Sequence, residues 1–191
     1  ISKTLETLGV HHDRFFNENS LYEDGEIERT IATLRERGLA YDKDGAVWIA
    51  TSRLGLENDR VIVKSTGEPT YRLPDMAYHR IKCERGDDLV VDIFGADHIS
   101  TVQEVIAGVG ALGSDATKIK VVLHQMVSFL KDGQPYKLSK RNGEQYTLDD
   151  LIQDLSADVV RYFFLMRSAD TQLVFDINLA MEQSDKNPVF Y

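Results

Sequence analysis

The sequence predicts an α/β fold built on a parallel sheet with helices against both of its faces. Two runs rich in Val and Ile, at 88–95 and 118–124, flank a helical pattern over 101–112 that Gly113 ends. Uninterrupted runs of this kind are typical of parallel strands buried on both faces, and the connection between them is then expected to be right-handed. We therefore expect a doubly wound sheet that binds ligands beyond the carboxyl ends of its strands.

The first third of the chain, residues 1–63, differs from this pattern and is expected to form an α+β region. Ile27, Ile31 and Leu34 share one face of a helix that Gly38 ends. Short strands are expected where β-branched and aromatic residues follow, at 46–50 and 60–64. This region therefore mixes helix and strand before the α/β part begins.

The last part of the chain is expected to be helical. The segment from Thr147 to Leu151 has the pattern of a capping box, in which a threonine and an acidic residue three positions later satisfy the first backbone groups of a helix. Apolar residues then recur at helical spacing, at Val159, Val160, Phe163, Phe164 and Met166. We expect a helix hairpin packed under the sheet.

Composition places the chain among ordinary globular proteins and excludes several classes. The 191 residues are 42% hydrophobic with a net charge of −9, which suits one domain with its own core. The single cysteine, Cys83, cannot form an internal disulfide, and no Cys and His spacing suits zinc. There is no apolar run long enough to span a membrane and no secretory or transit pattern at the start, so we expect a cytoplasmic protein without membrane contact.

A local concentration of positive charge stands out against this acidic background. Between Lys131 and Arg141 there are four cations and one acidic residue, a net charge of +3. Three of these cations lie in a loop bounded by Gly133 and Gly143, and a mobile loop of aimed cations is what phosphoryl transfer needs. The plainer interpretation is a solvated basic loop. The acidic charge elsewhere argues against broad attraction to nucleic acid, so any such contact would use a local patch of this kind.

Polar residues follow both predicted strands, at the edge where ligands are expected. Gly95-Ala96-Asp97-His98 comes directly after the first strand, where a glycine permits close approach and an acid can accept from ribose hydroxyls. Asp97 could equally cap the next helix. His124-Gln125-Met126 follows the second strand, and the alternative for His124 is a ring satisfied by the backbone.

The pentapeptide Lys137-Leu138-Ser139-Lys140-Arg141 resembles the Lys-Met-Ser-Lys-Ser signature of class I aminoacyl-tRNA synthetases, with Leu138 for Met and Arg141 for the final Ser. The segments around it resemble arginyl-tRNA synthetase in order and spacing, at 70–79, 94–98, 122–127, 146–151, 161–168, 182–184 and 187–188. The chain is identified as a member of that family, most strongly from Lys64 to Tyr191.

The resemblance implies a fold and a division of the chain. It implies the second half of a class I synthetase Rossmann-like parallel sheet with flanking helices, together with an inserted α+β region and a C-terminal helical stem. The inserted part is expected over 1–63, the nucleotide-binding half with the Lys-Met-Ser-Lys-Ser-like loop over 64–146, and the stem over 147–191, leading towards an anticodon-binding domain that the chain lacks.

The resemblance also implies that Tyr71, Asp75 and His98 hold a substrate arginine. Tyr71 and Asp75 lie four residues apart at an expected helix start, so their side chains can face one site, and a carboxylate binds a guanidinium through charge-assisted hydrogen bonds. Without the resemblance, Asp75 is an ordinary early helix residue beside Pro74, and Tyr71 an ordinary half-buried aromatic. The family usually carries Arg where this chain has Pro74, so we expect the start of this helix to differ.

An ATP site is implied as well, contributed by Gly95, Asp97, His124, Gln125, Met126, Leu138, Ser139 and Lys140. Within it, Lys140 is expected to be catalytic and to steady the α-phosphate and the departing pyrophosphate, with Lys137 as the supporting cation. Asp158 and Arg161 are expected to stabilise the helical stem instead.

The implied reaction joins arginine to ATP and passes the arginyl group to tRNA-Arg. ATP enters as a substrate with Mg2+, and no tightly bound cofactor or protein metal site is expected. DNA and membranes are not expected partners, and we expect a monomer.

Two further candidates are given no chemical role. His11-His12-Asp13 is interpreted as a surface turn because consecutive residues point in different directions, and Cys83 has no neighbouring base that would mark it as a nucleophile.

One part of the class I machinery is missing from the sequence. No His-x-Gly-His signature, which binds the ATP phosphates in these enzymes, occurs in it. We therefore expect an internal fragment of an arginine–tRNA ligase that is inactive alone. The alternatives are a non-catalytic nucleotide-binding, tRNA-binding or interaction module derived from a synthetase, and another class I synthetase.

Overall fold

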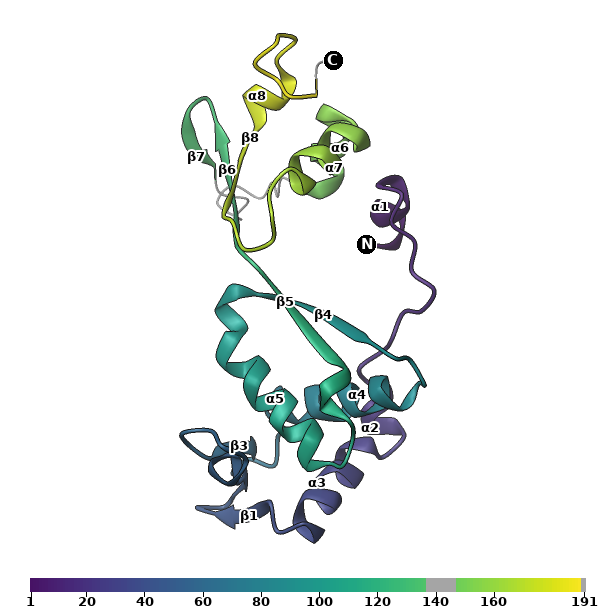
Figure 1. The fold of residues 1–191 in the computed structure, drawn as a ribbon, viewed down its shortest axis with the longest axis vertical. Coiled ribbons are helices and arrows are strands. Elements are labelled where there is room, and N and C mark those ends of the chain that lie inside the picture. The colour runs from purple at the N-terminus through teal and green to yellow at the C-terminus, as the bar shows by residue number, and fades with distance from the viewer. Residues whose placement is uncertain (137–146, 190–191) are drawn as a thin grey trace. The chain divides into compact units, whose positions relative to one another are not determined.

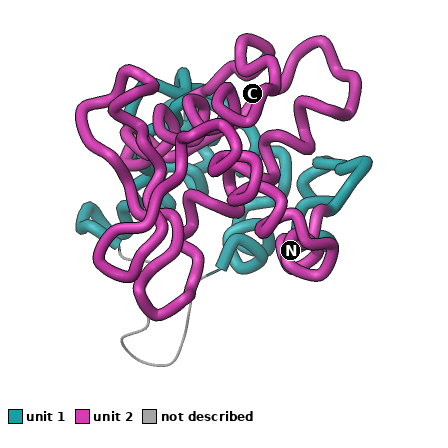
Figure 2. The backbone as a smooth tube through the Cα atoms, turned by 90° about the horizontal axis from the view of Figure 1, so that it is seen from below, with its two compact units in different colours: residues 1–15, 123–191 teal, residues 16–122 magenta. Residues whose placement is uncertain are grey.

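The computed structural model describes residues 1–136 and 147–189, and these divide into two compact units. Unit 1 combines residues 1–15 with the chain from 123 onward, and unit 2 is residues 16–122 (Figure 2). Each unit has its own hydrophobic core.

Unit 2 begins with helices and a small sheet and continues as an α/β segment (Figure 1). Its elements are α2 (Ser20–Glu23), α3 (Glu26–Glu36), β1 (Ala40–Lys43), β2 (Ala46–Ile49), the 3-10 turn η1 (Thr51–Leu54), β3 (Arg60–Val63), α4 (Arg72–Glu84), β4 (Val90–Gly95), the 3-10 turn η2 (Ala96–His98), α5 (Ile99–Ala111), the 3-10 turn η3 (Ala116–Lys118) and β5 (Ile119–His124). The boundary between the units falls within β5.

The predicted helix and strands of the first third are confirmed, and one strand is added. α3 buries Ile27 and Leu34 on one face, and β2 and β3 pair antiparallel. The added strand, β1, pairs antiparallel with β2 in a three-stranded sheet ordered β1-β2-β3. Asp44 and Gly45, both with positive φ (53° and 74°), join the two strands, as a two-residue hairpin of the Asp-Gly type requires.

The predicted strand, helix and strand are present as β4, α5 and β5, and β4 and β5 are hydrogen-bonded neighbours. α5 packs closely on α4 because Gly108 has no side chain: a Cβ there would come within 1.9 Å of Met76 Sδ. The expectation that both faces of these strands are buried is wrong for this chain. Val91 is 53% exposed and Ile93 is 72% exposed, so within the described residues helices cover one face.

A buried carboxylate connects three parts of unit 2. Glu104 on α5 is 6% exposed, and its two oxygens accept hydrogen bonds from Arg60 on β3 and Arg72 on α4. Burial alone would raise the pKa of Glu104, but the two arginines outweigh it and lower that pKa. The ionised carboxylate is therefore a structural requirement of the fold.

Unit 1 carries a second sheet and the C-terminal helices. Its elements are α1 (Ser2–Thr7), β6 (Val127–Lys131), β7 (Gln134–Tyr136), α6 (Leu148–Leu155), α7 (Ala157–Leu165), β8 (Leu173–Asp176) and α8 (Ile177–Met181). The sheet is ordered β7-β6-β8, with β6 and β7 antiparallel and β6 and β8 parallel. These three strands were not among the sequence predictions.

The predicted helix pair and its capping box are confirmed. Thr147 Oγ1 accepts the backbone N–H of Asp150, and the Asp150 carboxylate accepts the backbone N–H of Thr147. α7 packs on β8 through Phe163, whose ring centroid lies 5.1 Å from that of Phe175. The pair is thus held to the sheet of unit 1 by aromatic packing.

Replacement of Glu104 by Gln should lower the free energy of unfolding by about 2 kcal/mol at pH 7, because two arginines then face an uncharged group. The loss is smaller than for a fully buried pair, since the side chain of Arg60 is 34% exposed. A carboxylate whose folded pKa is lowered stabilises above its unfolded pKa, about 4.3, and that stabilisation is lost as the pH falls through the folded value. Urea unfolding between pH 7 and pH 3 measures both effects. Glu84→Gln is the control, since Glu84 is exposed and pairs with Arg80 at 3.6 Å, and it should change little. Equal losses in the two variants would contradict the role of Glu104.

Replacement of Thr147 by Ala should cost about 1 kcal/mol of stability, because the N-cap hydroxyl is lost, whereas Thr147→Ser should keep most of it. Urea unfolding followed by far-ultraviolet circular dichroism distinguishes the two. An alanine variant as stable as the serine variant would show that the capping box contributes nothing measurable.

Candidate functional site

The start of α4 places two of the predicted residues. Tyr71 is the N-cap, α4 begins at Arg72, and Asp75 lies in its first turn. Pro74 is accommodated without a break because the first backbone N–H groups of a helix have no partner within it. The backbone N–H of Asp75 donates to the carbonyl of Tyr71 at 3.2 Å. The two side chains are therefore held on one rigid helical turn.

Asp75 is half-buried and, within residues 1–136 and 147–189, forms no salt bridge. Burial raises its pKa, and Glu18 adds to the rise, while the nearby His79, Lys82 and His98 oppose it. A carboxylate held in this way gains from any cation brought to it. These surroundings favour the binding of a guanidinium, and they differ from those of a fully solvated surface carboxylate.

Tyr71 lies beside this carboxylate with 56% of its surface exposed. The guanidinium carbon of Arg72 lies 4.8 Å from the centre of its ring, and Arg72 is itself bound to Glu104. The ring is thus supported on one side by a fixed cation and is open to solvent on the other.

The loop after β4 carries Gly95, Asp97 and His98. Asp97 Oδ2 lies 3.7 Å from His98 Nε2, and both side chains are exposed. A Cβ at Gly95 would come within 2.5 Å of Asp97 Oδ1, so the glycine leaves room for that carboxylate. His98 is also close enough to Asp75 for its charge to act on the Asp75 pKa. The structure therefore brings Tyr71, Asp75 and the Gly95–His98 loop into one region of unit 2.

The remaining predicted residues are found in unit 1 or lie outside the described ranges. His124 Nδ1 lies 2.8 Å from the carbonyl oxygen of Gln125, so this ring nitrogen has a backbone partner, as the alternative interpretation of His124 predicted. The backbone N–H of Gln125 donates to the carbonyl of Ala169, and Met126 is 63% exposed. The predicted segment Lys137-Leu138-Ser139-Lys140-Arg141 lies outside the described residues.

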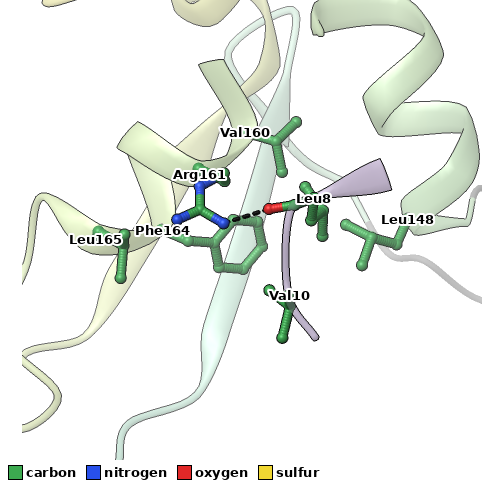
Figure 3. Close-up of a pocket in the computed structure, with 7 residues that line it drawn as sticks. All are labelled: Leu8, Val10, Leu148, Val160, Arg161, Phe164 and Leu165. Atoms are coloured by element: carbon green, nitrogen blue, oxygen red, sulfur yellow. Dashed lines mark hydrogen bonds between the residues drawn. The ribbon is translucent and has the colours of Figure 1, made fainter. Parts of the chain in front are cut away.

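Arg161 has the structural role that was expected of it. Its Nη1 donates to the carbonyl of Leu8, which ties the N-terminal segment of unit 1 to α7 (Figure 3). The two residues belong to the lining of an apolar pocket of about 290 Å³, which is formed by Leu8, Val10, Leu148, Val160, Arg161, Phe164 and Leu165. The pocket has one cation and no acidic residue in its lining, so it offers no acid–base pair.

Two other candidates from the sequence gain no chemical role. Across the described part of the chain, no group of three His, Cys, Asp or Glu residues could hold a metal ion, which leaves His11-His12-Asp13 without further ligands. Burial raises the pKa of the Cys83 thiol, and this disfavours the reactive thiolate.

No helix among residues 1–136 and 147–189 has the length and apolar character to cross a membrane.

Sequence reasoning missed three residues that support this region: Arg72, Glu104 and His79. His79 lies four residues after Asp75, and this spacing, which places both residues on one face of a helix, is a sequence signal for His79. The pairing of Arg72 with Glu104 spans 32 positions and had no local signal.

Comparisons with known proteins agree with one another. The family model for tRNA synthetases class I (R), catalytic domain, matches residues 1–163. The chain is 54% identical over its whole length to an arginine–tRNA ligase of Desulfotalea psychrophila, of which it covers 35%. It is 48% identical to an arginine–tRNA ligase of Salinibacter ruber, of which it covers 34%. The chain thus spans about a third of the length of these curated relatives.

Solved structures show the same fold. A structure described as an arginyl-tRNA synthetase from Campylobacter jejuni matches the whole chain with a TM-score of 0.87 at 35% identity, and the match covers 41% of that protein. The arginyl-tRNA synthetase of Thermus thermophilus matches 95% of the chain with a TM-score of 0.67 at 14% identity, and 40% of its own chain is covered. The second likeness concerns the fold alone.

Replacement of Asp75 by Asn should make unit 2 more stable at pH 7. A carboxylate whose folded pKa is raised destabilises the fold once it ionises, so the gain should fade as the pH falls towards its unfolded pKa, about 3.9. Asp92→Asn is the matched contrast, because the pKa of Asp92 is lowered and its loss should destabilise at pH 7. Urea unfolding at pH 7 and pH 4 measures both. A destabilised Asp75→Asn variant at pH 7 would contradict this picture of the site.

Proposed function

The chain belongs to the class I (R) tRNA synthetase catalytic domains, and from this premise we propose that it is part of an arginine–tRNA ligase. The proposed reaction has two steps. The arginine carboxylate attacks the α-phosphorus of ATP, which enters with Mg2+ as its counterion, and pyrophosphate leaves. A terminal hydroxyl of tRNA-Arg then attacks the carbonyl of the arginyl-adenylate, and AMP leaves.

The observation that carries the proposal is the half-buried Asp75 beside an exposed Tyr71, a carboxylate that forms no salt bridge within the described part of the chain. A guanidinium would give this carboxylate two charge-assisted hydrogen bonds, and Tyr71 offers a phenol and a ring face next to it. His98 completes the proposed arginine site, since its charge already acts on Asp75. Lysine, a point charge on a flexible stem, would use the planar carboxylate less well.

The residues proposed for ATP binding are those that the family resemblance implies. In unit 2, Asp97 would accept from the ribose hydroxyls, and Gly95 gives its carboxylate the necessary room. In unit 1, the backbone around Gln125 and Met126 would face the adenine. The segment Leu138-Ser139-Lys140 would bind the phosphates, with Lys140 as the catalytic cation and Lys137 as the supporting cation, because aimed cations stabilise the charge that develops on a transferring phosphoryl group.

The proposed division of the chain follows these roles. Residues 1–63 are the inserted part of the catalytic domain, 64–146 the second half of the nucleotide-binding fold, and 147–191 a helical stem. The proposed enzyme works in the cytoplasm as a monomer, with arginine, ATP and tRNA-Arg as its partners. No tightly bound cofactor is needed for this chemistry.

A second candidate function is a non-catalytic binding module derived from a synthetase. It is favoured by one observation, the lack of a His-x-Gly-His sequence in these 191 residues. Calorimetry of the chain itself with arginine and with ATP separates the two proposals. Binding of neither ligand favours the view that the site is completed by other segments of a longer enzyme, and tight binding of both shows a more complete site than we propose.

Replacement of Lys140 by Ala should lower arginine-dependent exchange between ATP and pyrophosphate at least 100-fold, because one aimed charge on the transition state is worth about 10²–10³ in rate. The measurement uses the ligase of Desulfotalea psychrophila with these 191 residues in place of its matching segment. Lys120→Ala, which removes an exposed lysine on β5, is the control and should leave the rate unchanged. Near-normal exchange in Lys140→Ala would remove Lys140 from its proposed role.

A further inference from the structure

His79 is a buried histidine that the proposed chemistry leaves without a role. It lies on α4 one turn after Asp75, is 4% exposed, and stacks on Phe94 of β4 with a ring separation of 6.1 Å. Buried polar rings of this kind are held by specific partners.

Both ring nitrogens of His79 face acceptors. Nδ1 lies 2.7 Å from the backbone carbonyl of Asp75, and a carbonyl can only accept, so Nδ1 carries a proton. Nε2 lies 3.0 Å from Asp92 Oδ2, within the range of an ion pair, and among the described residues that oxygen accepts no hydrogen bond. Lys82 donates to the other oxygen of Asp92. The arrangement is satisfied when both nitrogens are protonated and the ring is an imidazolium.

Asp92 is held in the ionised state that this requires. Burial alone would raise the pKa of Asp92, but His79 and Lys82 outweigh that effect and lower it. The chain therefore holds a charged network between α4 and β4, directly behind the first turn that carries Asp75.

We propose that His79 is a positioning residue for the arginine site: its imidazolium fixes the backbone of Asp75 against Asp92 and places a positive charge behind the carboxylate that binds the substrate. This inference rests on the proposed function. Because β4 continues into Gly95 and Asp97, the same ring also ties the arginine-binding helix to the strand that carries the proposed ribose loop.

The charges around the site fix the expected pH dependence. Asp75 is faced by His79 and Lys82 on its own helix, by His98 after β4, and by Glu18 from the segment before α2. Asp92 on β4 and the ring of Tyr78 complete the surroundings of His79. Since burial raises the pKa of Asp75, arginine binding weakens as the pH falls through it. Loss of the imidazolium moves that weakening to higher pH.

Two uncharged variants separate the contacts of the ring. An Asn at position 79 can keep the donor to the Asp75 carbonyl, and a Gln can keep a donor towards Asp92, but neither carries the charge. In the grafted ligase, each should raise the KM for arginine about 10-fold at pH 7, leave the KM for ATP and kcat within twofold, and shift the rise of the arginine KM to higher pH.

Arg80→Gln is the matched control. Arg80 lies on the same helix and pairs with Glu26, so its loss removes a partly buried ion pair that does not face Asp75. It should lower thermal stability without a change in the arginine KM profile. If the His79 variants behave in the same way, the role of His79 is merely structural and the inference is overturned.

Failure of the proposed function is recognised separately through Asp75→Ala. An unchanged arginine KM in that variant removes the arginine site itself, whereas a large rise there together with normal His79 variants overturns the inference alone. Should the His79 variants not fold, Asp92→Asn tests the contact from the strand side: it removes the partner that His79 shares with Lys82 and should also raise the KM for arginine at pH 7, and an unchanged KM would overturn the inference. Nitrogen NMR of the 191-residue chain at pH 7 is an independent measurement, and an unprotonated ring nitrogen in His79 would overturn the proposal.

Discussion

The fold of unit 2 depends on the pairing of one buried charge. Glu104 is nearly inaccessible to water, and an ionised carboxylate in that position is tolerable only because Arg60 and Arg72 both donate to it. The two arginines come from β3 and α4, so the carboxylate on α5 holds the small sheet and both helices in one arrangement. Apolar packing alone would allow neighbouring registers, since it is not directional.

α4 shows how this constraint serves the site. Its first turn is attached through Arg72 to α5, Arg80 attaches it to α3, and the buried His79 and Lys82 attach it to β4. Within the described residues, Arg72, Arg80 and Lys82 of this helix form salt bridges, whereas Asp75 forms none. A rigid frame around one unpaired carboxylate is the arrangement expected of a preorganised cation site.

Much of the secondary structure could be predicted because its signals are local. The periodicity of Ile27, Ile31 and Leu34 predicted α3, and the Thr147 capping box predicted the start of α6. The strand β1 was missed although Asp44-Gly45 carries a hairpin signal. The strands β6 and β8 were missed for a different reason: they pair in parallel across some 45 positions of sequence, and such pairing leaves little trace in either segment.

The sequence by itself determined the family and the residue types of the site. Tyr71 and Asp75 are adjacent on a helix whatever the rest of the chain does, because four residues make about one turn. Only the tertiary structure decided which charges remain unpaired. The ion pairs of Glu104 with Arg72 and of His79 with Asp92 join residues on different elements, and burial strengthens them in a way that composition does not reveal. The sequence therefore predicted the Asp75 carboxylate as a site residue, and the packing of the described residues decided that it is half-buried and forms no salt bridge with them.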